Sequence, residues 1–289
     1  MTRPSTADGI VRLPRRPADF VAPGPRPAGD GGDPNLLPQP GEDLGFLLGD
    51  WRIFQRVDGH RWSLDDLLTA WLAARLLRAR PPARALDLGT GIGSVLLMTA
   101  WNFPSARLEG VEAQPLSASL ARRSVAYNGA ADRVTVHDGD LRAFDGAHAF
   151  DLVTGTPPYF PPGQGTESTA VQKGPCRFEH RGGVDAYAEA AVRAVAPEGL
   201  VVLCHAALHR ERFLGAAAAA GLALRHVLDV AGREGKAPLV TVAAFAPPGA
   251  PRLDAAPQHE AFAVRGADQQ WTAPFRAVRR DMGMPLGPA

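Results

Sequence analysis

The nine residues from Ala85 to Gly93, ALDLGTGIG, constrain the fold of this chain more than any other stretch. The first four read as a buried strand, three glycines follow at alternate positions, and a helix-forming run begins at Ser94. Glycines at a strand-to-helix turn permit tight dihedrals and let a ligand approach the backbone closely. Asp87 lies at the carboxyl end of the strand, where open α/β sheets bind ligands. The stretch therefore predicts an α/β sheet with a ligand site at this turn.

The spacing of the glycines narrows the classes of ligand that the loop can bind. The dinucleotide fingerprint is G-x-G-x-x-G, whereas the order here is D-x-G-x-G-x-G, from Asp87 to Gly93. That order resembles the first motif of the class I S-adenosylmethionine (SAM) methyltransferases, whose loop packs against an amino acid and a nucleoside. An ordinary strand-to-helix turn is the alternative interpretation.

Composition separates a tail from a folded body. Residues 1–45 are rich in proline, glycine and aspartate and offer little apolar surface to offset the entropy lost on ordering. We expect a disordered tail over 1–45 and one domain over 46–289. Arginines of the tail, such as Arg12, Arg15 and Arg16, could contact RNA, but a solvated leader is the simpler interpretation.

Charge and hydropathy limit the class of protein. The net charge is +1, so the chain as a whole makes no electrostatic case for nucleic acid. No apolar stretch approaches the roughly 18 residues of a membrane span, and the N-terminus lacks the apolar core of a secretory signal. Cys176 and Cys204 have no metal-binding spacing. A cytoplasmic protein without a metal or a membrane partner is expected, and a monomer is the default.

The segment before the glycine loop predicts a short strand at 51–55 and a helix that begins after Ser63. Ser63 suits the N-cap, and Asp65 and Asp66 fall in the first helical turn. On physical grounds we interpret these two carboxylates as charges that favour the helix dipole.

Acids follow the next two strands of the predicted sheet. The strand 107–112 ends in Glu112, one strand-helix-strand step after Asp87. A carboxylate at the tip of this strand can accept hydrogen bonds from both ribose hydroxyls of a nucleoside, although a purely structural glutamate fits the same position. After the strand 133–137, Asp140 could accept a hydrogen bond from an adenine amino group.

The strand 150–154 runs directly into Gly155-Thr-Pro-Pro-Tyr-Phe160. Two consecutive prolines fix φ and hold the backbone stiff, which suits a binding site. The ring of Tyr159 offers a face on which a flat base could stack, a contact worth about 1–3 kcal/mol per base. The polar loop 161–182 that follows could hold an anionic substrate, and a solvated loop is the equal alternative.

The rest of the chain predicts alternating elements and one basic stretch. Helices are expected at 184–195 and 211–220, and strands at 200–204, 222–230 and 238–245. The C-terminal stretch 262–284 places several arginines beside Trp271 and Phe275: Arg265, Arg276, Arg279 and Arg280. A solvated helix face explains this cluster at least as well as a nucleic-acid contact.

Four motifs in order, ALDLGTGIG, GVEAQ, DGDL and FDLVTGTPPYF, resemble those of class I methyltransferases that act on exocyclic or amide nitrogen. The segments around Gln55–Leu68, Arg233–Pro238 and Val264–Phe275 are similar to the bacterial tRNA (adenine-N6)-methyltransferases that modify valine tRNA. The resemblance implies a Rossmann-like sheet of seven strands in the order 3-2-1-4-5-7-6. Strand 7 would be antiparallel, and helices would cover both faces.

The resemblance also assigns roles residue by residue. Asp87, Gly89 and Gly91 would line the methionine end of SAM, Glu112 would bind the ribose, and Asp140 the adenine amino group. Thr156, Pro157, Pro158 and Tyr159 would grip the target nitrogen. Position 156 departs from the family, which has asparagine there, although the threonine hydroxyl also has acceptor lone pairs.

The sequence thus predicts a SAM-dependent N-methyltransferase acting on adenine N6 of a structured RNA, with tRNA as the expected substrate. One alternative acceptor is a protein glutamine or a small-molecule amine, favoured by the low net charge and by Thr156. Another alternative is a SAM-binding module that contacts RNA without catalysis.

Overall fold

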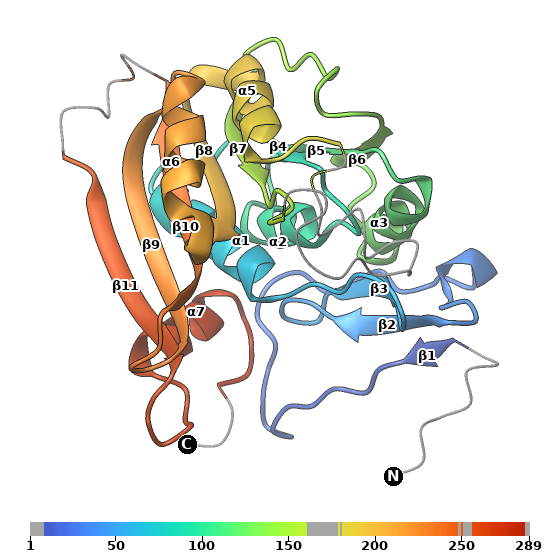
Figure 1. The fold of residues 1–289 in the computed structure, drawn as a ribbon. Coiled ribbons are helices and arrows are strands. Elements are labelled where there is room, and N and C mark those ends of the chain that lie inside the picture. The colour runs from blue at the N-terminus through green and yellow to red at the C-terminus, as the bar shows by residue number, and fades with distance from the viewer. Residues whose placement is uncertain (1–8, 161–178, 180, 248–249, 251–255, 287–289) are drawn as a thin grey trace.

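A computed structural model describes residues 9–160, 179, 181–247, 250 and 256–286 (Figure 1). An eight-stranded sheet forms its centre, in the order β11-β9-β10-β8-β7-β4-β5-β6. The strands are β4 (Arg84–Leu88), β5 (Arg107–Glu112), β6 (Val134–Asp138), β7 (Phe150–Gly155), β8 (Val195–Ala206), β9 (Ala223–Arg233), β10 (Pro238–Ala246) and β11 (Gln258–Arg265).

The strand order confirms the predicted topology and extends it. From β6 through β5, β4, β7 and β8 all pairs are parallel, and β10 is antiparallel to both β8 and β9. This is the order 3-2-1-4-5-7-6. The prediction of seven strands was wrong by one, because β11 pairs in parallel with β9 at the edge. An edge strand gains its structure from the partner's backbone, so the mostly exposed sequence of β11 carries little signal of its own.

Helices cover both faces of the sheet, as predicted. They are α1 (Leu64–Leu77), α2 (Ser94–Asn102), α3 (Pro115–Tyr127), α5 (Val184–Ala194), α6 (Arg210–Ala219) and α7 (Ala273–Asp281). One hydrophobic core contains residues of α1, α2, α3 and α7, and a second contains residues of α5 and α6. The sheet lies between the two cores. It fixes the positions of the loops at its carboxyl edge. No helix in the described ranges is long and apolar enough to cross a bilayer.

Residues 9–45 differ from the disordered tail that their composition predicts. They include β1 (Ile10–Val11), the short helix η1 (Pro34–Leu36) and most of β2 (Glu42–Phe46), which pairs with β3 (Arg52–Arg56). Long-range contacts hold this segment: Arg12 binds the buried carboxylate of Asp43 at 2.7 Å, and Gly29 N–H donates to the Tyr127 carbonyl at 2.9 Å. Composition does not reveal such tertiary partners. Residues 1–8 of the predicted tail lie outside the described residues.

Candidate active site

A cavity of about 680 Å³ lies at the carboxyl ends of β4, β5, β6 and β7. We call it the cleft. Its wall contains eight of the predicted site residues, namely Gly89, Gly91, Glu112, Asp140, Thr156, Pro157, Pro158 and Tyr159. The parallel strands end at the same edge of the sheet, so their four loops meet there although up to 70 residues separate them (Figure 1).

The glycine loop after β4 needs glycine at two positions for different reasons. Gly89 has φ +59°, and a Cβ there would lie 2.0 Å from the hydroxyl oxygen of Tyr187. Gly91 has φ +57°, but a Cβ there would meet only the Gly89 carbonyl oxygen, at 4.0 Å. The first glycine therefore allows α5 to pack against the loop, while the second leaves open space on the side of the cleft.

Asp87 lies behind the glycine loop and is not among the described residues that line the cleft. Its side chain is buried and accepts hydrogen bonds from the hydroxyls of Thr90, at 2.6 Å, and Thr154, at 2.8 Å. The carboxylate thus joins β4, the glycine loop and β7. Burial raises the pKa of Asp87 from 3.8 to about 6, although the two threonine hydrogen bonds oppose the shift. Its position fits bracing of the loop, and contact with the methionine end of SAM stays a prediction.

We expect Asp87→Asn to remove a pH-dependent part of the stability. The pKa of Asp87 is raised in the folded protein, so the stability linked to its bound proton is fully present below pH 3.8. That stability is lost as pH rises through about 6. The difference between the two pKa values corresponds to about 3 kcal/mol in the free energy of unfolding. Urea denaturation at pH 4, 5, 6 and 7 measures it.

Asp19→Asn is the matched control, because Asp19 is exposed. The wild type and this control should lose stability together as pH rises, while Asp87→Asn should follow a flatter profile. If Asp87→Asn keeps the full wild-type slope between pH 4 and 6, the buried carboxylate does not hold the proton.

Glu112 ends β5 and lines the cleft with a largely buried carboxylate. One oxygen accepts from the backbone N–H of Gly91 at 2.8 Å, and the other from that of Gln114 at 2.7 Å. Burial raises its pKa, against the effect of these hydrogen bonds. A carboxylate has about four lone-pair sites, so each oxygen can still accept from a ligand hydroxyl.

Asp140 also lines the cleft, but it already has a partner. Both carboxylate oxygens accept from the Arg142 guanidinium, at 2.6 to 3.1 Å, and this pairing lowers the pKa of Asp140. An adenine amino group would therefore have to share these oxygens with Arg142. The adenine contact stays a prediction.

The segment Thr156–Tyr159 continues β7 into the cleft. Pro157 and Pro158 are buried, and Thr156 is half-buried. The Tyr159 hydroxyl donates to Asp65 at 2.6 Å, and its ring centroid lies 5.2 Å from that of His205. Burial raises the pKa of Tyr159 well above its usual range, with Cys204 and Asp65 adding to the shift. The hydroxyl therefore stays protonated, and its hydrogen bond fixes the ring in the cleft.

Asp65 and Asp66 are residues whose place in the site the sequence did not reveal. Both line the cleft at the first turn of α1. Asp66 accepts from the backbone N–H of Ser63 at 3.0 Å, and its pKa is raised by burial and by the neighbouring Asp65. The helix-dipole interpretation described only their position on α1. Their place just before the first strand of the sheet was the available signal, because α1 then packs beside the glycine loop.

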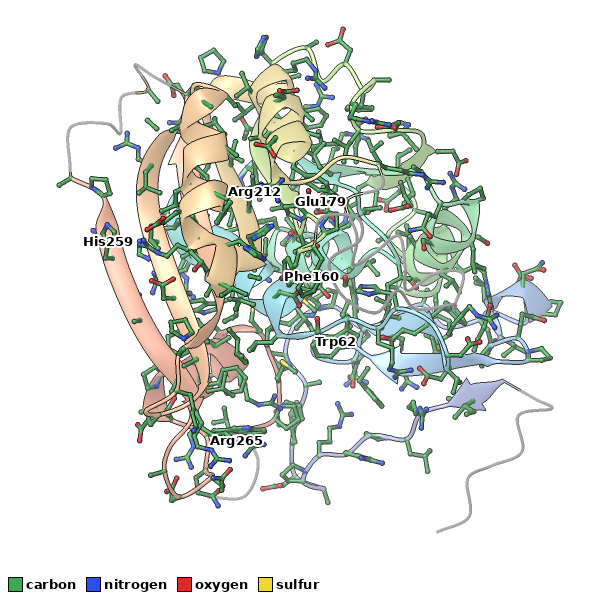
Figure 2. All side chains as sticks on the ribbon, viewed as in Figure 1. Trp62, Phe160, Glu179, Arg212, His259 and Arg265 are labelled. Atoms are coloured by element: carbon green, nitrogen blue, oxygen red, sulfur yellow. The ribbon has the colours of Figure 1, made fainter. Side chains whose placement is uncertain are left out.

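Only part of the predicted loop 161–182 belongs to the described residues; positions 161–178 and 180 lie outside them. Glu179 donates its backbone N–H to the Phe160 carbonyl at 3.0 Å, and its carboxylate binds Arg212 of α6 at 2.6 Å (Figure 2). Arg181 lines the cleft. The described end of this loop thus connects the cleft to α6, which the sequence did not predict.

The central part of the chain is similar to known methyltransferases. Residues 63–173 match the family model described as Methyltransferase small domain. A tRNA1(Val) (adenine(37)-N6)-methyltransferase of Porphyromonas gingivalis is 38% identical over 99 residues, covering 32% of this chain and 38% of that protein. A ribosomal protein uL3 glutamine methyltransferase of Bradyrhizobium diazoefficiens is 37% identical over 106 residues, covering 35% of this chain and 32% of that protein.

The aligned region spans less than half the length of these curated relatives. Among solved structures, a predicted O-methyltransferase from Agrobacterium tumefaciens superposes with a TM-score of 0.56 at 16% identity. That match covers 76% of this chain and 98% of the other, so the two proteins share the fold.

Proposed function

We propose that this chain, which carries a methyltransferase small domain at residues 63–173, transfers a methyl group from SAM to an amine nitrogen. Adenine N6 of a structured RNA is the acceptor that we favour. One observation carries the proposal: the glycine loop, Glu112 and the Thr156–Tyr159 segment line a single cleft.

The residues of the cleft fit SAM in shape and in charge. The open space at Gly91, where a Cβ would meet only one atom at 4.0 Å, leaves room for a ligand against the backbone. Glu112 keeps lone pairs for two ribose hydroxyls after its two backbone hydrogen bonds. Asp65 and Asp66 add carboxylates to the wall, which favour a cationic ligand. SAM would supply an electrophilic methyl group on a sulfonium cation.

The chain's own residues would position and polarise the amine. The Thr156 hydroxyl and the Pro157 carbonyl are acceptors for its N–H groups, so they would orient its lone pair. Tyr159, fixed by Asp65, would hold the plane of the base. No strong base is required, because the amine proton becomes acidic only after the nitrogen carries positive charge. Catalysis would then come from orientation and fixed dipoles.

The choice of RNA rests on similarity and on the aromatic ring of Tyr159. The relative from Porphyromonas gingivalis is named for adenine N6 of a tRNA, and a stacking platform suits a nucleobase better than an aliphatic amide. Radiolabelled SAM, incubated with total small RNA and followed by nucleoside analysis, tests the proposal. We expect a labelled N6-methyladenosine peak from the wild type and none from Tyr159→Ala. If SAM binds and no RNA is labelled, the RNA acceptor is wrong.

A protein glutamine is the second candidate acceptor. The relative from Bradyrhizobium diazoefficiens is named for that activity, and Thr156 stands where the nitrogen-methylating family has asparagine. Salt distinguishes the two, because RNA binding weakens steeply with ionic strength and peptide binding does not. If neither acceptor is methylated, the remaining interpretation is favoured, namely a SAM-binding module that contacts RNA without catalysis.

A further inference from the structure

A second cavity, of about 720 Å³, borders the cleft. Val57 and Arg61 line both cavities. Five arginines belong to the wall of the second cavity, and no aspartate or glutamate of the described ranges does: Arg12, Arg15, Arg16, Arg61 and Arg279. We call it the arginine cavity. The N-terminal segment and α7 are far apart in the sequence. Residues of both line this cavity, and the two parts of the chain run near one another in the fold (Figure 1).

Three of the five arginines have carboxylate partners. Arg12 and Arg61 both bind Asp43 at 2.7 Å, and the Asp43 side chain is completely buried. Arg16 binds Asp50 at 2.6 Å. Three guanidinium groups thus share two carboxylates, which leaves one positive charge in excess at this side of the cavity.

The remaining two arginines have no carboxylate partner among the described residues. Arg15 is exposed at the rim. Arg279 is half-buried, donates to the Pro285 carbonyl at 2.8 Å, and lies 3.9 Å from the centre of the Trp271 ring. Burial lowers the pKa of Arg279 to about 10. A partly desolvated guanidinium without a counter-ion is costly, and an anion placed beside it would remove that cost.

We infer that the arginine cavity binds a backbone phosphate of the RNA whose adenine enters the cleft, an inference that rests on the proposed function. Guanidinium groups bind phosphate oxygens in pairs, and several arginines in one wall match a polyanion. Phe46 and Trp62 also line the cavity, and single-stranded RNA is held by such a combination of arginines and aromatic rings. The shared wall at Arg61 places the phosphate beside the target nucleotide.

The fold explains why neither basic stretch of the sequence predicted a phosphate site. Arg12, Arg15 and Arg16 belong to a segment with more acids than bases, and Arg279 belongs to a helix about 260 residues later. Each stretch reads as a solvated face when taken alone. Their positive charges add up only because β1, β2 and α7 place them around one cavity.

The test compares RNA affinities at several salt concentrations. Labelled unfractionated tRNA is titrated with the wild type, with Arg15→Gln and with Arg15→Gln/Arg279→Gln, and Arg107→Gln is the control. Arg107 is an exposed arginine at the amino end of β5, at the opposite edge of the sheet from the cleft. The slope of log affinity against log salt should fall by about 1 for the single variant and about 2 for the double. At 0.1 M salt each lost contact should weaken binding about tenfold.

Arg15→Gln keeps the test decisive if the double variant unfolds, since Arg15 is exposed and its replacement should leave the melting temperature and SAM affinity unchanged. Unchanged slopes in Arg15→Gln and in a folded double variant would overturn the inference. Inorganic phosphate provides the second arm. If it raises the melting temperature of the wild type but not of the double variant, while tRNA binds both equally, the cavity holds a free anion and the RNA assignment is wrong.

The inference and the proposed function fail in different ways. If the arginine variants methylate RNA with an unchanged KM, the inference falls and the function stands. If the slopes fall as expected but the wild type labels only a glutamine-containing protein, the arginine cavity binds RNA phosphate, while the RNA acceptor and the placement of that phosphate beside a target adenine are wrong.

Discussion

Gly89→Ala is expected to destabilise the protein by about 2–4 kcal/mol and to abolish SAM binding. The residue has φ +59°, and an added Cβ would lie 2.0 Å from the hydroxyl oxygen of Tyr187. Because Tyr187 is largely buried on α5, it has little room to move aside. The loop would shift into the cleft, where the ligand is expected to bind. Urea denaturation and titration calorimetry with SAM measure the two effects.

Gly91→Ala is the matched control. It has nearly the same φ, +57°, but its Cβ would meet only one atom, at 4.0 Å. The conformational cost alone is about 1–2 kcal/mol. We therefore expect a smaller loss of stability than in Gly89→Ala, with SAM binding impaired because the methyl group occupies the cleft. Equal destabilisation by the two substitutions would contradict the role of the Tyr187 contact.

Tyr159→Ala is expected to lower the rate of methyl transfer by about 100-fold or more while leaving SAM affinity nearly unchanged. The ring lies on the loop after β7 and is fixed by its hydrogen bond to Asp65 and its contact with His205. Without the ring the acceptor base would lose its platform, whereas the glycine loop and Glu112 stay intact. Single-turnover transfer from labelled SAM and equilibrium SAM binding separate the two effects.

Tyr159→Phe keeps the ring and removes the hydroxyl with its hydrogen bond to Asp65 and its contact with the Cys204 sulfur. Its rate of transfer should fall between those of the wild type and Tyr159→Ala. If Tyr159→Ala loses SAM binding and transfer to the same extent, Tyr159 supports the cofactor pocket rather than the acceptor.

The sequence predicted the fold well because the relevant signals are local. The carboxyl edge of the sheet is marked by Gly89 and Gly91 and by an acid at the end of each of the first strands. These signals can be recognised without any knowledge of tertiary contacts. The edge strand β11 and the path of residues 9–45 were not predicted. Both depend on backbone or charge partners far away in the chain, such as β9 for β11 and Asp43 for Arg12.

The candidate site shows the same division between local and tertiary signals. Residues that end a strand or directly follow one, such as Glu112 and Thr156, line the cleft, and their roles stay predictions. Asp87 also lies near the end of a strand. Its burial behind Thr90, however, depends on how β7 packs beside it. Asp65 and Asp66 reach the cleft because α1 packs on a face of the sheet against β7 and β8. The position of α1 before the first strand indicates this tertiary arrangement only in part.

The carboxylates around the cleft have a consequence for the heat of ligand binding. Burial raises the pKa values of Asp66, Asp87 and Glu112, so part of this set carries protons in mildly acidic solution. A cation that enters the cleft favours their ionised forms, and binding therefore expels protons into the solvent. Affinity for such a cation rises with pH until the set is fully ionised. Over the same range, the measured enthalpy depends on the ionisation heat of the buffer that accepts the protons.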